Sequence, residues 1–441
     1  MRYKEYKKVD IPWLDEIPSH WEIERGKFFI YSKKEINKDK KIMNVLSLTL
    51  NGVIRNDLEN PIGLSPSDYS TYQIFKNNDL VFKLIDLDNI RTSRVGLVNE
   101  LGIMSSAYIR EIINKNILFP KYIYYWYYKL YIEEVYNKLG SGVRSTISSS
   151  ELLEMQIPIP AKEEQEQIAR FLDWKINEID RLIELEKQKI KKLEINFTII
   201  INNIFNAVEG EKVKLKYIFD FGKGLNVTKD DLSENGIKCI SYGEIHGKNR
   251  FSFSSDDKNL KSLGSHVKLN IFANLNQGDF VFCDTSEDLE GSGNFSYKKD
   301  SGIVYASYHT IVAKPKVNFN SEYIAYFFES DLWRAQIRAN VKGIKVYSIT
   351  QFILKDSYII LPDIYTQKKI VKNLNHFKGK KINLVNNISA TIKNLESLKQ
   401  SLISDVVTGR IDVRGIEIPN YDKVYDIEED AMLGENFEEE V

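Results

Sequence analysis

The 441-residue chain contains two copies of one sequence pattern. Equivalent residues in the two copies are separated by a constant 202 positions. The pairs are Ile159-Pro160 with Leu361-Pro362, Gln165 with Gln367, Ile168 with Ile370, Ile190-Lys191 with Ile392-Lys393, and Leu193-Glu194 with Leu395-Glu396. Further upstream, Asp79–Phe82 matches Asp279–Phe282 at a separation of 200, so the offset drifts by only two residues. A repeat of nearly constant period predicts two copies of one structural unit.

A long helix is predicted at the end of each copy. In the first copy, apolar residues recur at alternating steps of three and four from Ala169 to Ile204, the heptad pattern of a helix that packs along a seam. In the second copy Lys378, Lys381 and Lys399 interrupt this pattern, and Phe377, Ile382 and Leu384 are possible substitutes nearby. Thr408-Gly409 follows, and a glycine in this place is typical of a helix end.

Neither helix is expected to be stable alone, because its apolar seam needs a partner. Two long helices of one chain most simply pair antiparallel as a coiled coil. The alternative is two independent amphipathic helices, each buried on its own domain. The expected seam residues are Leu172, Ile176, Ile179, Ile183, Ile190, Leu193, Val385, Ile388, Ile392 and Leu395.

The remainder of each copy is predicted to be a globular unit of mixed helix and strand. Strand-like segments lie at 45–50, 80–84, 280–282 and 303–305, and a short aromatic helix follows in each half, at 122–131 and 323–328. Core packing explains those aromatic residues better than base stacking does. The fold class is therefore α+β, with two pseudo-repeated globular units joined by two long antiparallel coiled-coil helices. The expected divisions are 1–158 and 209–361 for the globular units, 159–208 and 362–410 for the helices, and 411–441 for an acidic tail.

The net charge of -1 conceals an uneven distribution. Residues 411–441 contain eleven acidic and two basic residues, a net charge of -9, which leaves +8 on the rest of the chain. Such a tail is commonly a solvated, solubilising or interacting segment. A moderately basic body permits an anionic partner without proving one.

A reducing, cytoplasmic location is expected, because the chain has only two cysteines, Cys239 and Cys283. The first residues contain no apolar stretch of signal-peptide length, and no run approaches 18 apolar residues, so no membrane span is expected.

Enzyme motifs are missing from the sequence. The five histidines are scattered without metal-ligand spacing. No phosphate-binding loop, nucleophile elbow, dinucleotide fingerprint or adenine-methyltransferase signature occurs. We therefore expect no catalytic residue, no metal and no cofactor in this chain.

Three motifs resemble the specificity (S) subunit of type I restriction–modification systems. The segment 13–21, WLDEIPSHW, is similar to the family's W-L-G-x-I-P-x-H-W start, with Asp15 in place of glycine. The segment 157–172 resembles the family's I-P-x-P-x-x-x-E-Q-x-x-I-A-x-F-L pattern at the first conserved helix, and 398–409 resembles its closing L-x-x-x-L-I-x-x-x-V-T-G. The second copy departs from the pattern, with Thr366 and Val371 in place of glutamate and alanine.

The resemblance implies a non-catalytic subunit that recognises DNA. In this family each globular unit is a target recognition domain that reads one half of a split double-stranded DNA sequence. The paired helices set the gap between the half-sites, and their surfaces form the subunit interface with two methyltransferase (M) subunits. Restriction (R) subunits complete the assembly and cut unmodified DNA.

The resemblance also directs attention to polar loops between the predicted strands. Lysine and arginine would neutralise phosphates, and base edges would be read by arginine, lysine or amide side chains. The candidates in the first half are Lys83, Arg91, Thr92, Arg94, Arg144, Ser145 and Thr146. Those in the second half are Tyr242, Lys342, Lys345 and Tyr347. For each residue taken singly, an ordinary exposed loop side chain remains the simpler interpretation.

Two other functions stay open at this point. A nuclease would need clustered carboxylates with a lysine at metal-site geometry. A coiled-coil scaffold unrelated to DNA would need globular units without a basic concave surface.

Overall fold

The computed structural model describes residues 2–50, 52–56, 68–85, 87, 94–139, 146–343 and 345–423. The chain forms two compact units. Unit 1 comprises residues 1–186 and 389–441, and unit 2 comprises residues 187–388. Each unit thus contains one half of each long helix.

The elements that begin in unit 1 are β1 (Tyr6–Ile11), β2 (Leu14–Pro18), β3 (Glu22–Arg25), β4 (Ile30–Ser32), β5 (Leu46–Thr49), β6 (Gly52–Arg55), β7 (Gln73–Phe75), β8 (Leu80–Phe82), β9 (Val95–Leu97), β10 (Gly102–Met104), β11 (Ile109–Ile113), α1 (Pro120–Ile132), α2 (Val135–Leu139), α3 (Ser149–Glu154), β12 (Gln156–Ile159) and α4 (Lys162–Ala207). Those that begin in unit 2 are β13 (Glu211–Lys214), α5 (Leu215–Ile218), β14 (Phe219–Lys223), β15 (Leu232–Ser233), β16 (Ile237–Ile240), α6 (Tyr242–His246), β17 (Phe251–Phe253), β18 (Lys261–Leu263), β19 (Asn274–Leu275), β20 (Phe280–Cys283), β21 (Thr285–Ser286), β22 (Phe295–Lys298), β23 (Val304–Ala306), β24 (Thr310–Pro315), α7 (Ser321–Glu329), α8 (Asp331–Arg338), β25 (Tyr347–Ser348), α9 (Gln351–Asp356), β26 (Tyr358–Leu361) and α10 (Ile364–Val407).

The duplication predicted from the sequence is visible in the sheets. The four-stranded sheet of unit 1 has the order β4-β11-β8-β9, and unit 2 repeats it as β14-β24-β20-β22 before adding β17. In both units the central pairs are antiparallel. Unit 2 also has a second five-stranded sheet, β15-β18-β16-β23-β19. The predicted α+β class and the two-fold repeat are confirmed.

Equivalent side chains make equivalent contacts at the start of the two long helices. Gln165 donates to the Pro160 carbonyl at 2.9 Å, and Gln367 donates to the Pro362 carbonyl at 2.8 Å. Each glutamine also accepts a backbone N–H from the segment that precedes the aromatic helix of its unit. Repeated contacts of this kind show that the two copies share their local architecture as well as their strand order.

The aromatic helices α1 and α7 lie in the cores of their units, as predicted. Tyr122, Trp126 and Tyr323 are fully buried. The cores pack these helices against the strands and against the helix halves of the same unit. The aromatic residues there stabilise the fold by burial and edge-to-face contact.

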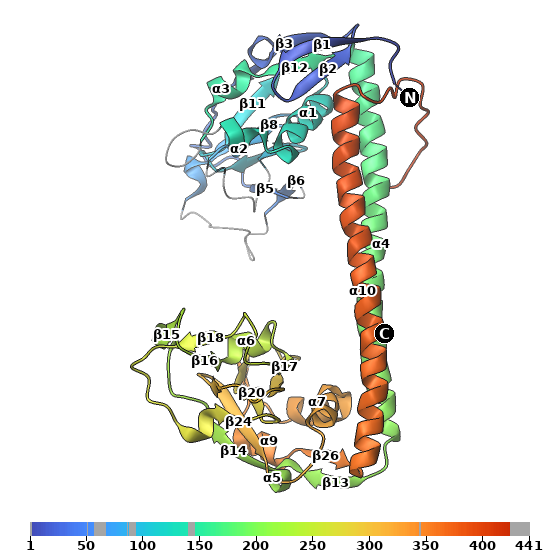
Figure 1. Cartoon of the computed structure of the whole chain (residues 1–441). Coiled ribbons are helices and arrows are strands. Elements are labelled where there is room, and N and C mark those ends of the chain that lie inside the picture. The colour runs from blue at the N-terminus through green and yellow to red at the C-terminus, as the bar shows by residue number, and fades with distance from the viewer. Residues whose placement is uncertain are drawn as a thin grey trace, which may run out of the picture. The chain divides into compact units, whose positions relative to one another are not determined.

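The long helices α4 and α10 run antiparallel within each unit (Figure 1). In unit 1, Leu172 shares the core with Val406, and further along α4 the carboxylate of Asp180 pairs with Lys399 at 2.8 Å. In unit 2, Lys381 lies 4.8 Å from the ring centre of Phe197. The ten predicted seam residues are buried or half-buried.

The three lysines that interrupt the predicted seam each have a specific partner. Lys399 forms the ion pair with Asp180, and Lys381 lies over Phe197. Lys378 lies 4.1 Å from the ring centre of Phe251, and burial lowers the pKa of Lys378. Their methylene stems cover apolar surface while the ammonium groups meet an aromatic face or a carboxylate. The proposed substitutes Phe377, Ile382 and Leu384 were a wrong prediction, because they are 40%, 46% and 49% exposed.

The end of α10 follows the predicted glycine signal. Gly409 has φ 73°, the left-handed conformation that glycine adopts without steric cost, and its N–H bonds to the Val406 carbonyl at 3.1 Å. The chain then turns back onto α4, where Gln167 donates to the carbonyls of Val413 and Ile416 at 3.0 and 2.7 Å. Of the two alternatives given for the tail, a solvated or an interacting segment, residues 413–416 take the second, because their backbone contacts α4.

Among the described residues, helices long and apolar enough for a bilayer crossing are not found.

Candidate functional site

The structure brings together the separate polar segments predicted in unit 2. Strand β25, which contains Tyr347, pairs with β21, and the backbone N–H of Ile349 donates to the Asp284 carbonyl at 2.8 Å. Helix α6, which begins at Tyr242, lies beside the same segment. Between them lies a groove of about 810 Å³. Its lining residues are Tyr242, Gly243, His246, Arg250, Thr285, Ser286, Glu287, Asp288, Glu290, Gly291, Asn294, His309, Arg338 and Val346. We call this the unit 2 groove.

Tyr242 is held in the groove wall by aromatic contacts. Its ring meets Tyr308 and His309 edge-on, at centre distances of 5.7 and 5.4 Å. His309 in turn contacts the Asp284 carboxylate at 3.1 Å and has φ 53°, an uncommon conformation for a residue with a side chain. Such a conformation persists only where the surroundings impose it, which is typical of functional loops.

A chain of buried polar contacts supports the floor of the groove. His246 accepts from the Asn294 amide at Nδ1 and donates from Nε2 to the Thr285 carbonyl, at 2.9 and 3.0 Å. The Asn294 carbonyl accepts from Arg334 at 3.1 Å, and Arg334 also contacts Glu329 at 3.1 Å. Both ring nitrogens of His246 are thus engaged within the described chain.

Glu329 links this chain to the groove edge. Its other carboxylate oxygen accepts from Arg250 at 2.8 Å. Burial raises the pKa of Glu329, but the charges of Arg334 and Arg250 outweigh burial and hold that pKa below its usual range. The network therefore keeps a carboxylate ionised between two guanidinium groups and restrains the groove side chains.

The groove exposes both donors and acceptors. Ser286 is 3% exposed, and neither its hydroxyl nor Nε of Arg338 has a hydrogen-bond partner within the described part of the chain. Glu287, Asp288 and Glu290 lie on the adjacent loop and are exposed. The exposed carboxylates can accept hydrogen bonds from a ligand, whereas the two unpaired atoms are buried in the groove wall.

The other unit 2 predictions lie at the margin of this groove. Lys342 and Lys345 are exposed on the segment that leads into β25. Lys342 forms an isolated bridge to Ser348. The structure thus places one aromatic residue in the groove wall and two lysines next to it.

Unit 1 has the same junction. The backbone N–H of Ile147 donates to the Leu84 carbonyl at 3.1 Å, which matches the contact of Ile349 with Asp284. This contact brings the two predicted unit 1 segments together: Lys83 precedes Leu84, and the half-buried Thr146 precedes Ile147.

One of the remaining unit 1 candidates, Arg94, is buried. Arg94 is 1% exposed and donates to the Leu87 carbonyl at 2.9 Å, so its guanidinium supports the loop from inside. Four other candidates lie outside the described residues: Arg91, Thr92, Arg144 and Ser145.

Sequence reasoning missed the loop at 284–294, which supplies much of the unit 2 groove. The signal was present in the duplication. Adding the local offset of 200 to the predicted unit 1 loop at 86–94 leads to 286–294.

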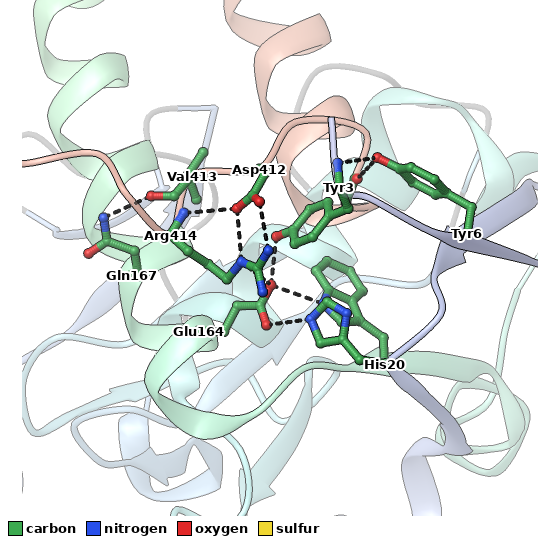
Figure 2. A network of polar contacts seen from close by, with 10 residues as sticks. Tyr3, Tyr6, His20, Glu164, Gln167, Asp412, Val413 and Arg414 are labelled. Carbon is green, nitrogen blue, oxygen red and sulfur yellow. Dashed lines mark hydrogen bonds and ion pairs between the residues drawn. The ribbon is translucent and has the colours of Figure 1, made fainter. Parts of the chain in front are cut away.

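Two of the three motif segments, 13–21 and 157–172, meet at the start of α4 in unit 1, together with Tyr3 and with residues 412–414 (Figure 2). Glu164 is 6% exposed and accepts from Tyr3 Oη at 2.6 Å and from Trp21 Nε1 at 3.1 Å. His20 Nε2 lies 3.0 Å from Oε2 of Glu164, and Arg414 Nε lies 4.0 Å from Oε1, the oxygen that accepts from Tyr3 and Trp21. Burial, followed by the contact with Glu164, raises the pKa of Tyr3.

The second copy departs from the motif at the position of Glu164. The position equivalent to Glu164 is Thr366, whose hydroxyl donates to Asp363 at 2.6 Å in an exposed helix cap. In unit 2 α4 leads directly into β13. Glu164 thus joins a buried network in the first copy, whereas its counterpart Thr366 belongs to an exposed helix cap.

Groups of three or more histidine, cysteine or carboxylate side chains placed to hold a metal ion are absent from the described residues.

Comparison with known proteins adds three findings. The type I restriction modification DNA specificity domain matches residues 21–195 and 208–394. The type I restriction enzyme MjaVIII specificity subunit of Methanocaldococcus jannaschii is 23% identical over 442 residues, which cover 94% of this chain and 98% of the relative. A chain from a structural study of assembly and conformational transition in the type I R-M system superposes with a TM-score of 0.62 at 13% identity, covering 90% of this chain and 99% of that one.

Proposed function

Since the chain belongs to the type I restriction modification DNA specificity family, we propose that its two units each read one half of a split double-stranded DNA sequence. It is a specificity subunit with two target recognition domains, and methylation and cleavage are performed by partner subunits. We infer that the protein binds DNA in the cytoplasm, where host and invading DNA are found.

The observation that carries this proposal is the convergence of separate loops on the unit 2 groove. Base edges present mixed donors and acceptors, and the groove offers the same mixture. Arginine pairs with guanine, and a carboxylate accepts from the amino group of cytosine. Arg338 and the carboxylates of Glu287 and Glu290 therefore suit base reading better than phosphate binding.

Phosphate contacts would come from basic and polar residues around each reading site. In unit 2 these are Lys342, Lys345 and Tyr347. In unit 1 they are Lys83, Arg91, Thr92, Arg144, Ser145 and Thr146, whereas the buried Arg94 would hold the loop in place. Such contacts position the duplex and make affinity salt-dependent without reading sequence.

The paired helices would set the spacing of the half-sites and bind two methyltransferase subunits, with restriction subunits completing the complex. In support, both helices carry exposed apolar side chains outside the seam. These are Leu182, Leu185, Ile195, Ile199, Phe377, Ile382, Leu384 and Leu398, each at least 40% exposed. Exposed apolar residues in this number are typical of a surface that a partner covers.

The test is to map methylated adenines in a host that expresses this chain with its methyltransferase. Wild type should produce one split motif. Arg338→Ala should relax one position of one half-site, since a bidentate contact to a base contributes about 1–3 kcal/mol of discrimination. Lys268→Gln, an exposed change in unit 2 outside the groove, should alter neither half-site. An unchanged motif in Arg338→Ala, or changes in both half-sites, would count against the assignment of the groove.

A further inference from the structure

The two copies of the long helix differ sharply in charge over one stretch. Residues 162–186 of α4 contain four basic and eight acidic residues. Their counterparts 202 positions later, residues 364–388 of α10, contain six lysines and no acidic residue. Two helix segments of the same ancestry and the same local packing therefore carry net charges of -4 and +6.

Four of these lysines form one exposed surface in unit 2. Lys368, Lys369, Lys372 and Lys380 are exposed, as is His376 between them. We call this surface the lysine face. None of the four lysines has an ion-pair partner among the described residues. Lys368 and Lys372 stand one helical turn apart, a spacing at which like charges destabilise a helix. Such an arrangement favours an anionic partner.

In unit 1 the chain itself covers part of the equivalent surface, while Arg170 and Glu178, the counterparts of Lys372 and Lys380, are exposed. Gln167 and Asn177, the counterparts of Lys369 and Gly379, bond to the backbone of the segment 413–422. Figure 1 shows this segment running beside α4 after the end of α10. In unit 2 a Cβ added to Gly379 would have no neighbour within 4 Å, so the same surface is bare. The repeat thus shows that this helix surface can bind an extended segment.

We propose that the lysine face binds an acidic segment of one methyltransferase subunit, at the place that 411–423 occupies in unit 1. This inference rests on the proposed function, which supplies the partner. DNA is the weaker candidate, because Val371 and Leu374 on the opposite side of α10 are buried in the core of unit 2. The lysine face therefore points away from the body whose groove would hold the DNA.

The consequence is that the two methyltransferase positions are not equivalent. The position on unit 2 depends on exposed ion pairs, which salt weakens. On unit 1 the chain's own segment occupies part of this helix surface, at Gln167 and Asn177. Rising salt should therefore release one methyltransferase subunit before the other.

The experiment compares the full chain with the quadruple variant K368Q/K369Q/K372Q/K380Q, each assembled with the methyltransferase. Native mass spectrometry at increasing salt counts the methyltransferase subunits per chain. The variant should bind one of the two about ten-fold more weakly, as expected for the loss of four exposed ion pairs. The control K187Q/K191Q/K192Q/K393Q removes the same charge from exposed positions elsewhere on the helices.

Several outcomes would overturn the inference. The quadruple variant could hold both methyltransferase subunits with wild-type salt dependence. It could instead weaken DNA binding by the chain alone, which would make the lysine face a DNA contact. Removal of residues 424–441 could strengthen methyltransferase binding, which would make the acidic tail the occupant. A wild-type complex that methylates no split sequence would refute the proposed function itself, whatever the lysine variants do.

Discussion

Glu164 provides the sharpest test of how unit 1 is held together. Its carboxylate accepts from Tyr3 and Trp21 and contacts His20, in a site where only 6% of the residue is exposed. Glu164→Gln keeps the size of the side chain but replaces the carboxylate, whose Oε1 accepts from both Tyr3 and Trp21, by a neutral amide. The new N–H₂ group takes the place of one of the two carboxylate oxygens.

The size of the effect follows from these contacts. A hydrogen bond to a charged group contributes about 1.5–3 kcal/mol, and a buried donor left without a partner costs about 1–3 kcal/mol. Glu164→Gln replaces two hydrogen bonds to a charged group by two neutral ones, at a cost of about 1 kcal/mol each, so the expected loss is about 2 kcal/mol in the free energy of unfolding of unit 1. For a unit of roughly 240 residues this lowers the melting temperature by about 4–8 °C.

The matched control is Thr366→Ala, the same position in the second copy. Thr366 loses one exposed cap contact with Asp363, which should cost about 0.5–1 kcal/mol. Differential scanning calorimetry measures both variants. In parallel, trypsin should cut Glu164→Gln faster at Arg414, because the C-terminal segment loses its anchor. A melting temperature of Glu164→Gln within 1 °C of wild type (about 0.5 kcal/mol or less) would contradict the role assigned to Glu164. An equal loss of unfolding free energy in Glu164→Gln and Thr366→Ala would contradict it as well.

Three further predictions concern other parts of the fold. Gly379→Ala should raise the free energy of unfolding by about 0.5–1 kcal/mol, because a Cβ at this helix position meets no neighbour within 4 Å. Gly409→Ala should lower the free energy of unfolding, because φ is 73° and a Cβ would lie 2.4 Å from Pro18. Thermal melts measure both changes. Leu172→Ala should cost about 2–5 kcal/mol in urea unfolding and Leu182→Ala less than about 0.5, because the first is fully buried and the second 49% exposed. The lowered pKa of Glu329 contributes stability above its unfolded pKa of about 4.3, and this contribution is lost as pH falls through the folded value. Glu329→Gln should therefore flatten the acid side of a stability–pH profile below about pH 4.3, and an unchanged slope would contradict the assignment.

Much of the candidate site could be predicted only as loops. Tyr242 and Tyr347 were identified by sequence, but their segments are more than a hundred residues apart. Only strand pairing brings the segment of Tyr347 to the groove that Tyr242 lines. Arg94 illustrates the limit, because its charge suggests a phosphate contact while the fold buries it. The ion pairs of Glu329 with Arg334 and Arg250 could not be predicted from the sequence, because tertiary packing determines which carboxylate contacts which guanidinium group.

The sequence alone determined the duplication, the two long helices and the end of α10 at Gly409, because periodicity and local backbone preference are written in neighbouring residues. It also contains the charge difference between residues 162–186 and 364–388, to which the lysine face belongs. Tertiary structure decided which polar groups share a groove, that Glu164 joins a buried network in the first copy, and that 411–423 binds α4. These features depend on contacts between residues far apart in the chain, and no local pattern specifies such contacts.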